Sequence, residues 1–486
     1  MRKSVIPKAV MRTGRLGRVL AVLCAVFAIG VAVADGQTGA AQPRTGVAQS
    51  EAFAATVTVH ASAAVVGHTN NQYIGLSFES GTLNSGKFDN VGDLPQMLRN
   101  LGRSVIRFGG NSVDTSFTKI TPSALAGLVR LANATGWTVL YSENLGRYNA
   151  RAVTRSAHKV SAALGRHLAA FACGNEPDLF PNVGLRSSSY SESDYLAQAA
   201  RCLAAVRAGA PNAPIEGPDT AGTGWLDSYA AAEADRLRWL GQHYYPMGCG
   251  LGGTTPAAFA ARMLSPGQTA KEAAFFSAAA RVAAAAHAAL RISETNTACH
   301  GGAVGVSDAY ASALWVVDYL LTGVEHGVTG FNFHGGVSTY CQGYTPLCQV
   351  GVNEYAAQPI YYGMLFTHLL GSGNLQPVTV TTPDPGDDVT AFALKPAAGG
   401  GLRMIVEDLT DSQAKVTLRV GGTPSSAAVL HLTGPSLLAT SGVRIQGTAV
   451  AADGSFAPGA PNTVKCSSGD CRVTLAPYSA VLVTID

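Results

Sequence analysis

Short apolar runs alternate with longer Ala- and Leu-rich segments of helical period between about residues 72 and 370. The apolar runs predict eight strands, at residues 73–79, 104–109, 138–142, 168–174, 214–218, 240–245, 290–294 and 330–334. The segments between them predict helices at 94–101, 123–134, 152–164, 193–208, 226–234, 271–289 and 307–326, with a last helix at 354–370. Eight such repeats predict an α/β fold, a (β/α)8 TIM barrel over residues 71–370. An open doubly wound sheet is the alternative, but no GxGxxG motif follows the first strand.

The pattern changes after residue 371 to short alternating runs separated by Gly, Pro, Asp and Ser. These runs predict strands at 378–382, 389–394, 403–407, 416–420, 428–432, 471–475 and 480–485. We therefore expect a C-terminal antiparallel β-sandwich domain over residues 371–486. Residues 55–60 are also strand-like and have no partner in the barrel, so we expect the segment 55–70 to join the sandwich.

The first 34 residues have the features of an export signal. Arg12, Arg15 and Arg18 precede an uncharged apolar run at 19–33, and small residues close it at 32–34. This pattern predicts a signal peptide over residues 1–34, and the run is shorter than the roughly 20 residues of a membrane span. Residues 35–54 lack periodicity and are expected to be a disordered leader. The mature chain is expected to be secreted or periplasmic, without a membrane span.

Cysteine usage agrees with export. Removal of the signal takes Cys24 with it and leaves an even set of Cys173, Cys202, Cys249, Cys299, Cys341, Cys348, Cys466 and Cys471, which suits an oxidising compartment. The pairs 341 with 348 and 466 with 471 each close a short loop and are the easiest to form, but the connectivity stays open. No CxxC pair or HxxxH spacing is present, so no metal site is predicted.

Charge excludes some classes of partner. Charged residues make up 13% of the chain and the net charge is +3, part of which belongs to the predicted signal. Neither a nucleic-acid partner nor a basic membrane patch is indicated. No cofactor is predicted.

Polar residues repeatedly follow the predicted barrel strands. Active sites of such barrels lie at the carboxyl ends of the strands, where this sequence has Glu79, Arg107, Asn111, Asn175, Glu176, His243, Tyr244, Tyr245, Glu294 and His334. Apolar strands that end in charged and polar groups indicate a site rather than a core.

Two of these carboxylates suit glycosidic cleavage. Glu176 follows the fourth strand and Glu294 the seventh, and these strands lie across the barrel mouth from each other. The side chains can therefore face each other at the about 5 to 5.5 Å that double displacement requires. A lone glutamate at a strand end is often the N-cap of a helix, but two at these positions, with Asn175 before the first, favour a catalytic pair.

These residues carry a resemblance to a known family. The segment 175–177 (Asn-Glu-Pro) together with Glu294 resembles the retaining (β/α)8 clan of glycoside hydrolases with catalytic glutamates on strands 4 and 7. Segments 74–79, 106–114, 174–178 and 294–302 are similar to glycoside hydrolase family 79, which contains β-glucuronidases and heparanases. The likeness covers the barrel from residue 73 to about 370, and the family's all-β module matches the predicted layout.

The resemblance implies roles for several residues. It makes Glu176 the acid/base and Glu294 the nucleophile, and it places Asn175 against the sugar 2-hydroxyl. Arg107 either keeps Glu294 ionised or forms a purely structural ion pair. Tyr245 either donates a hydrogen bond to the same carboxylate or packs under a loop.

Sugar recognition is expected around the same strand ends. Glu79 and Asn111 would meet sugar hydroxyls, and His334, Tyr340 and the loop 297–302 would surround the far side of the ring. Family members often have a tyrosine shortly after the nucleophile, where this chain has Cys299 and His300. His300 and Tyr340 are therefore the candidates for binding a uronate carboxylate, unless Cys299 only ties its loop to Cys249.

The sequence therefore predicts a secreted retaining exo-β-glucuronidase that acts on a glucuronide-containing carbohydrate. Three alternatives stay open. They are an endo-acting heparanase-like hydrolase, a retaining β-glycosidase of the clan with another sugar specificity, such as arabinofuranoside or glucosylceramide cleavage, and a catalytically silent glycan-binding protein. The presence of both carboxylates argues against the last.

Overall fold

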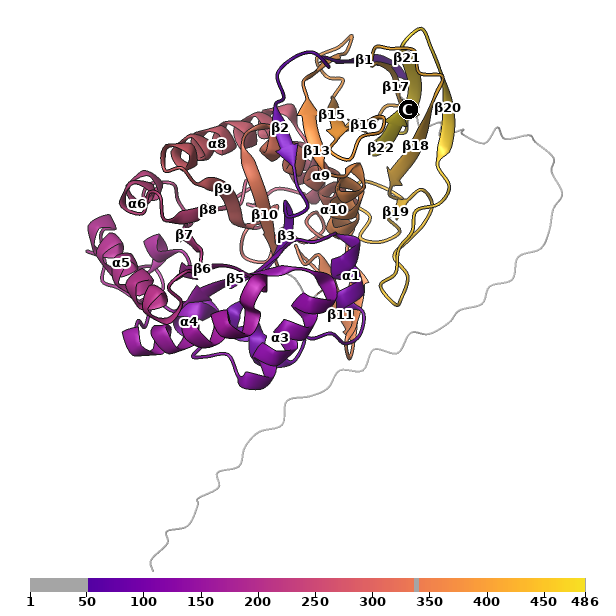
Figure 1. Cartoon of the computed structure of the whole chain (residues 1–486). Coiled ribbons are helices and arrows are strands. Elements are labelled where there is room, and N and C mark those ends of the chain that lie inside the picture. The colour runs from indigo at the N-terminus through magenta and orange to yellow at the C-terminus, as the bar shows by residue number, and fades with distance from the viewer. Residues whose placement is uncertain (1–50, 336–340, 486) are drawn as a thin grey trace, which may run out of the picture. The chain divides into compact units, whose positions relative to one another are not determined.

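A computed structural model describes residues 51–335 and 341–485, and eight parallel strands form a closed barrel in it (Figure 1). The strands are β3 (Ile74–Glu79), β4 (Val105–Gly109), β5 (Thr138–Glu143), β6 (Leu168–Cys173), β7 (Ile215–Thr220), β8 (Leu237–Tyr244), β9 (Ala289–Thr295) and β10 (Val328–His334). They pair in chain order, and β10 closes the circle against β3. The predicted fold class is confirmed. The predicted signal peptide and most of the predicted leader lie outside the described residues.

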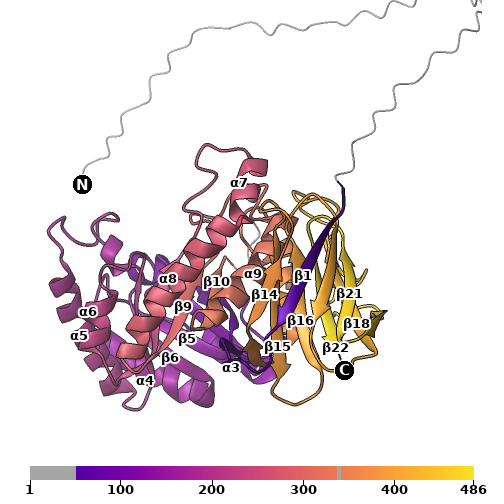
Figure 2. The same ribbon diagram turned by 90° about the horizontal axis from the view of Figure 1, so that it is seen from above.

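Helices follow the strands and surround the barrel (Figure 2). They are α1 (Leu94–Asn100), α2 (Ser112–Thr115), α3 (Pro122–Thr135), α4 (Ala150–Leu164), α5 (Glu192–Gly209), α6 (Leu226–Ala232), α7 (Pro256–Met263), α8 (Pro266–Ala285), α9 (Tyr310–Glu325) and α10 (Pro359–Leu370), with 3-10 turns η1 (Ser80–Ser85), η2 (Gly165–His167) and η3 (Pro177–Leu179). Local sequence sets many of their starts. For example, Ser191 and Asp194 form a capping box at the start of α5.

Two predicted helices have different limits in the structure. The helix expected at 271–289 is α8, which starts at Pro266 and stops at Ala285. It stops because His287 adopts a left-handed conformation (φ 54°). The helix expected at 354–370 starts only at Pro359, since residues 354–357 form β12 (Glu354–Ala357) in a hairpin with β11 (Leu347–Gly351). A residue before proline is disfavoured in helical conformation, which separates the two elements.

A second sheet of 12 strands forms the β-sandwich. It contains β1 (Phe53–Val59), β2 (Gly67–Thr69), β13 (Gly373–Gln376), β14 (Val378–Thr381), β15 (Val389–Pro396), β16 (Leu402–Asp408), β17 (Ala414–Arg419), β18 (Ser426–Thr433), β19 (Arg444–Ile445), β20 (Asn462–Ser467), β21 (Asp470–Leu475) and β22 (Ser479–Ile485). Val57, Val416, Val473 and Val483 are buried together in its core. The sheet is antiparallel except that β1 runs parallel to β17. The strand starts at Phe53, so the predicted leader is two residues too long at its C-terminal end.

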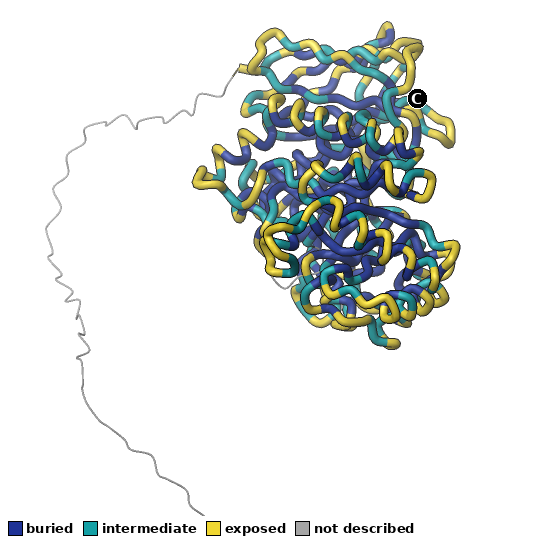
Figure 3. The backbone as a smooth tube through the Cα atoms, turned by 90° about the vertical axis from the view of Figure 1, so that its left-hand side faces the viewer, coloured by how far each residue is buried: buried dark blue, intermediate teal, exposed yellow. Residues whose placement is uncertain are grey.

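The barrel and the sheet share a buried boundary. Every residue of α9 from Tyr310 to Val324 is buried, because the helix lies against the barrel on one side and near the sheet on the other. The hydroxyl of Tyr310 donates to the carbonyl of Leu432 at 3.0 Å. Figure 3 shows buried backbone running through both parts of the molecule.

Four disulfides join cysteines of the described chain. They are Cys173–Cys202, Cys249–Cys299, Cys341–Cys348 and Cys466–Cys471, and they include both of the short-loop pairs that the sequence favours. No helix in the described part of the chain combines the length and the apolar character of a membrane span.

Candidate active site

The backbone at the end of β6 presents Glu176 in an unusual conformation. Glu176 has φ 48°, in the left-handed region that non-glycine residues rarely adopt. Its N–H donates to the carbonyl of Asp219 at 2.8 Å, and Pro177 starts the following turn. Next to it, the N–H of Asn175 donates to the Asp114 carboxylate at 2.8 Å. The neighbouring strand β7 and helix α2 thus fix the loop that carries Glu176.

Glu294 lies in β9 and accepts hydrogen bonds on both carboxylate oxygens. Arg107 Nη1 donates to Oε2 at 2.7 Å, and the hydroxyl of Tyr245 donates to Oε1 at 2.8 Å. The side chain is 8% exposed, and His334 Nδ1 lies 3.6 Å from Oε2. Such contacts favour an ionised carboxylate.

Glu176 and Glu294 lie close together, with His243 beside both. One carboxylate oxygen of each glutamate and one ring nitrogen of His243 all lie within 4.8 Å of one another. This spacing agrees with the short separation of retaining glycosidases, about 5 to 5.5 Å, and not with the about 6.5 to 9.5 Å of inverting ones.

The surroundings of Glu294 keep it charged. Burial by itself raises the pKa of this carboxyl, but the positive field of His334, His243 and Arg107 and the hydrogen bond from Tyr245 lower the pKa to about 2. The ionised form, which can act as a nucleophile, is therefore the resting form over the working pH range of most enzymes.

Arg107, at the centre of β4, joins these groups. Its side chain is fully buried, and besides Glu294 it donates to Asp219 Oδ2 at 3.0 Å, Asn175 Oδ1 at 2.9 Å and Ser77 Oγ at 3.0 Å. Burial disfavours the charged guanidinium, but the carboxylates of Asp219 and Glu294 outweigh this and raise the pKa of Arg107. Both readings of Arg107 from the sequence meet here, since it binds Glu294 and also forms a structural ion pair with Asp219.

His243 connects Asp219 to Glu176. Its Nδ1 lies 3.1 Å from Glu176 Oε1, and its Nε2 lies 3.6 Å from Asp219 Oδ1 and 3.0 Å from Arg107 Nη2. Burial lowers the pKa of His243, but Glu294, Asp219 and Glu176 raise it to about 10. At that pKa both ring nitrogens carry a proton. The contact with Arg107 instead requires Nε2 to accept, so that only Nδ1 carries one. Nδ1 carries a proton in both cases. His243 therefore donates to Glu176.

The carboxylate of Glu79 is bonded to the backbone of the turn that carries Asn111. Glu79 accepts hydrogen bonds from the N–H of Asn111 at 3.2 Å and from the N–H of Ser112 at 2.8 Å. A side chain at Gly110 would lie 2.4 Å from the Glu79 carboxyl carbon, and φ there is 67°, so glycine is required. The sequence assigned Glu79 to a sugar hydroxyl, but most of its acceptor positions are used by this turn.

Asn175 keeps one donor available. Its Oδ1 accepts from Arg107 and from the N–H of Gly110 at 3.0 Å, which fixes the amide orientation. Its Nδ2 is left facing Asn111 Oδ1 at a long 3.4 Å.

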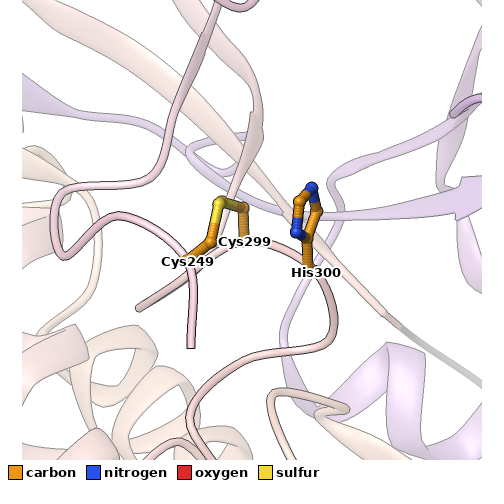
Figure 4. A group of neighbouring side chains, drawn as sticks. All are labelled: Cys249, Cys299 and His300. Carbon is orange, nitrogen blue, oxygen red and sulfur yellow. A yellow bond between two sulfur atoms is a disulfide. The ribbon is translucent and has the colours of Figure 1, made fainter. Parts of the chain in front are cut away.

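The loop after β9 places His300 beside a disulfide (Figure 4). His300 is exposed and directly follows Cys299, which is bonded to Cys249. Its φ of 55° lies in the left-handed region. The next residue, Gly301, accepts a hydrogen bond from the N–H of Tyr344 at 3.1 Å. Tyr344 in turn stacks on Tyr245 at 6.2 Å between ring centroids. Tyr340 lies outside the described residues.

Among the described residues, two groups of side chains have the spacing of metal ligands. One is Cys249, Cys299 and His300, but its two sulfurs are joined in the disulfide. The other is Glu176, His243 and Glu294, where the guanidinium of Arg107 already supplies positive charge to Glu294. Both groups are therefore engaged in other bonds.

The sequence missed Asp219, Ser293 and Tyr344 as parts of the site. The fifth predicted barrel strand stops at Pro218, whereas β7 continues to Thr220 and contains Asp219. A carboxylate placed directly after a strand was the signal that could have found it. Tyr344 is brought in by a long loop, and no periodicity marks it.

The fold resembles several solved glycoside hydrolases. A 4-O-α-L-rhamnosyl-β-D-glucuronidase from Fusarium oxysporum aligns with a TM-score of 0.73 and 21% identity, over 88% of this chain and 100% of that one. A family 51 arabinofuranosidase from Xanthomonas axonopodis (0.64, 14%, 90% and 100%) and a family 44 xyloglucanase from Paenibacillus polymyxa (0.63, 12%, 89% and 100%) are also similar. No protein-family model and no curated protein matches the chain. At these identities the likeness shows the fold: a (β/α)8 barrel with an attached β-sandwich.

Proposed function

We propose that the chain is an exported retaining glycoside hydrolase of the family 79 type that removes terminal β-D-glucuronic acid. The observation that carries the retaining mechanism is the close pair at the barrel mouth, with carboxylate oxygens of Glu176 and Glu294 within 4.8 Å of each other. The fold of a rhamnosyl-glucuronidase supports the choice of sugar. The four disulfides and the signal-like N-terminus support export.

The two carboxylates divide the reaction between them. In the first step the ionised Glu294 attacks the anomeric carbon while Glu176 gives its proton to the leaving oxygen, so the aglycone departs as an alcohol. In the second step Glu176 takes a proton from water, the water oxygen bonds to the anomeric carbon, and the bond to Glu294 breaks. The sugar leaves with its anomeric configuration retained.

The neighbouring residues assist these steps. Arg107 and Tyr245 hold Glu294 ionised and oriented. The free amide donor of Asn175 suits a hydroxyl beside the reacting carbon. His334 Nδ1 lies 3.6 Å from Glu294 Oε2 and helps to keep this carboxylate ionised.

A uronate carboxylate needs donors beyond the catalytic pair. His300 and the backbone N–H groups of its loop are the donors that we assign to it, with Tyr340 as a further candidate. A neutral glucoside would leave these donors without the anion, at a cost of about 1 to 3 kcal/mol for each donor that the bound sugar shields from water.

A panel of p-nitrophenyl glycosides tests the proposal. We expect kcat/KM for the β-glucuronide to exceed that for the β-glucoside by several orders of magnitude, and His300→Ala to lower only the glucuronide value. Equal rates on the two sugars would refute the uronate assignment and leave the retaining mechanism intact. Hydrolysis with inverted configuration, followed by NMR of the first sugar product, would refute the mechanism itself.

A further inference from the structure

Asp219 contacts the supports of both proposed catalytic carboxylates but neither carboxylate itself. It lies near the end of β7, is fully buried and has φ 57°. Its Oδ2 accepts from Arg107 Nη2 at 3.0 Å, and its Oδ1 accepts a short hydrogen bond from the hydroxyl of Ser293.

One side of Asp219 leads to Glu294. The guanidinium of Arg107 is a rigid fork, so binding Nη2 to Asp219 aims Nη1 at Glu294, 2.7 Å away. Ser293 precedes Glu294 in β9, so its bond to Asp219 also fixes the backbone that carries the nucleophile.

The other side leads to Glu176. Asp219 Oδ1 lies 3.6 Å from His243 Nε2, and the opposite nitrogen of this ring donates to Glu176 at 3.1 Å. The carbonyl of Asp219 also accepts the N–H of Glu176 at 2.8 Å. This bond holds the left-handed backbone that directs Glu176 toward Glu294.

We propose that Asp219 is a positioning residue that aligns the acid/base and the nucleophile with each other, acting through His243 and Arg107. The inference rests on the proposed function. In that reaction negative charge passes from Glu294 to Glu176 in the first step and returns in the second. The negative charge of Asp219 does not change in either step, so Arg107 and His243 keep their geometry whichever glutamate is ionised.

The charge state of Asp219 agrees with this role. Burial raises its pKa, but Arg107 and His243 reverse the effect and lower the pKa well below the usual range. The adjacent Glu216 is equally buried, and burial together with the charge of Asp219 raises its pKa. Of this pair, Asp219 is the one that carries the negative charge.

Asp219→Asn tests the inference, because it keeps the shape and removes the charge. We expect kcat to fall roughly 10- to 100-fold, the range for partners that orient catalytic groups, with KM changed less than about threefold. The loss should be larger for aryl glycosides with poor leaving groups, which depend most on proton donation by Glu176. Glu272→Gln is the matched control: it makes the same change at a buried carboxyl bonded to Gln268 and Trp315, and kcat should stay at the wild-type value.

A double-mutant cycle with His243→Gln tests whether Asp219 acts through the imidazole. The two losses should be strongly non-additive. Additive losses, or a wild-type kcat in Asp219→Asn, would overturn the inference. If Asp219→Asn does not fold, Ser293→Ala removes one of its bonds and should lower kcat with the same leaving-group dependence, and an unchanged kcat there counts against the inference equally.

The substrate is the glycoside that the wild-type protein cleaves fastest, so a wrong sugar assignment leaves this test unaffected. A wild-type protein inactive on every glycoside would instead overturn the proposed function.

Discussion

Two clusters of buried carboxyl groups differ in their partners, because cations accompany only one of them. At the barrel mouth, Asp219 and Glu294 share Arg107. Between α9 and the sheet, Asp318 and Glu407 are buried without a paired Arg, Lys or His among the described residues, and Asp388 lies near them. We call these last three the acidic seam.

The same burial has opposite outcomes in the two regions. Burial raises the pKa of Asp318 to about 6 and that of Asp388 to about 7, and it raises the pKa of Glu407 well above its usual range. At the mouth, the cations reverse the effect of burial on Glu294. A buried acid is therefore a poor indicator of catalysis by itself, and its partners decide whether it can act as an anion.

The largest expected effect comes from making one substitution in both regions. Glu294→Gln removes the proposed nucleophile and should lower kcat/KM by roughly 10⁴-fold or more. Glu407→Gln replaces an acid that already holds its proton, so kcat/KM should stay within about threefold of wild type. Initial rates on an aryl β-glycoside measure both, and full activity in Glu294→Gln would refute the assignment of the nucleophile.

Removing Arg107 should leave the buried carboxylates of the barrel mouth without their shared cation, as in the acidic seam, and so destabilise the fold. Arg107→Met leaves Asp219 and Glu294 buried without the guanidinium that they share, and removing one partner of a buried ion pair costs about 3 to 5 kcal/mol of unfolding free energy. Urea denaturation measures this loss. The control is Arg130→Met, which breaks the ion pair with Asp89 at the surface, where the arginine side chain is 57% exposed, and should change the midpoint little. Equal shifts in the two variants would contradict the contrast.

The sequence predicted most of the fold, but it predicted only the barrel-mouth side of the contrast between the mouth and the acidic seam. Strand and helix periodicity located all eight barrel strands, and turn residues located most of the sheet. It also singled out Glu176, Glu294, Arg107 and Tyr245 at strand ends, where chain order alone brings side chains together. The hairpin of β11 and β12 was missed, because its residues continue the apolar pattern of α10.

Contacts between distant segments could not be read from the chain. Asp219 and Ser293 are 74 residues apart, and nothing local in either segment marks their bond. The acidic seam joins α9 to residues of the sheet. Its three members are far apart in the sequence, and each looks like an ordinary acidic residue there. Their significance depends on tertiary packing.

Opposite pH windows should separate the regions. Asp318 and Asp388 of the seam have raised pKa values, so the stability they contribute is complete below their usual pKa of 3.8 and is lost as the pH rises from there through about 6 to 7. Glu294 has a lowered pKa, so its contribution is present above the usual 4.5 and is lost as the pH falls toward about 2. These two windows meet between 3.8 and 4.5, so urea unfolding should show the maximum stability at about pH 4. Between about pH 5 and about pH 8, Glu407→Gln should lose less stability than wild type, and an equal loss would exclude Glu407 as a source of the decline.

The smallest expected effect on stability concerns the hydrogen bond that Thr390 donates to Glu407 in the seam. The hydroxyl of Thr390 donates to Glu407 Oε2 at 3.3 Å, a long bond that tends to lower the pKa of Glu407 against the larger effect of burial. Thr390→Val keeps the shape of the side chain and removes the donor, which should cost about 0.5 to 1.5 kcal/mol. Hydrogen bonds to a charged acceptor are stronger than those to a neutral one, so a cost that is larger at about pH 8 than at about pH 5 would show that Glu407 loses its proton within this range. Urea denaturation of both proteins at the two pH values gives the difference, and Thr390→Ser, which keeps the hydroxyl, is the control. A pH-independent cost would show that Glu407 remains protonated throughout, and Glu407 would then contribute to the alkaline loss of stability over the whole range, because only its unfolded form ionises.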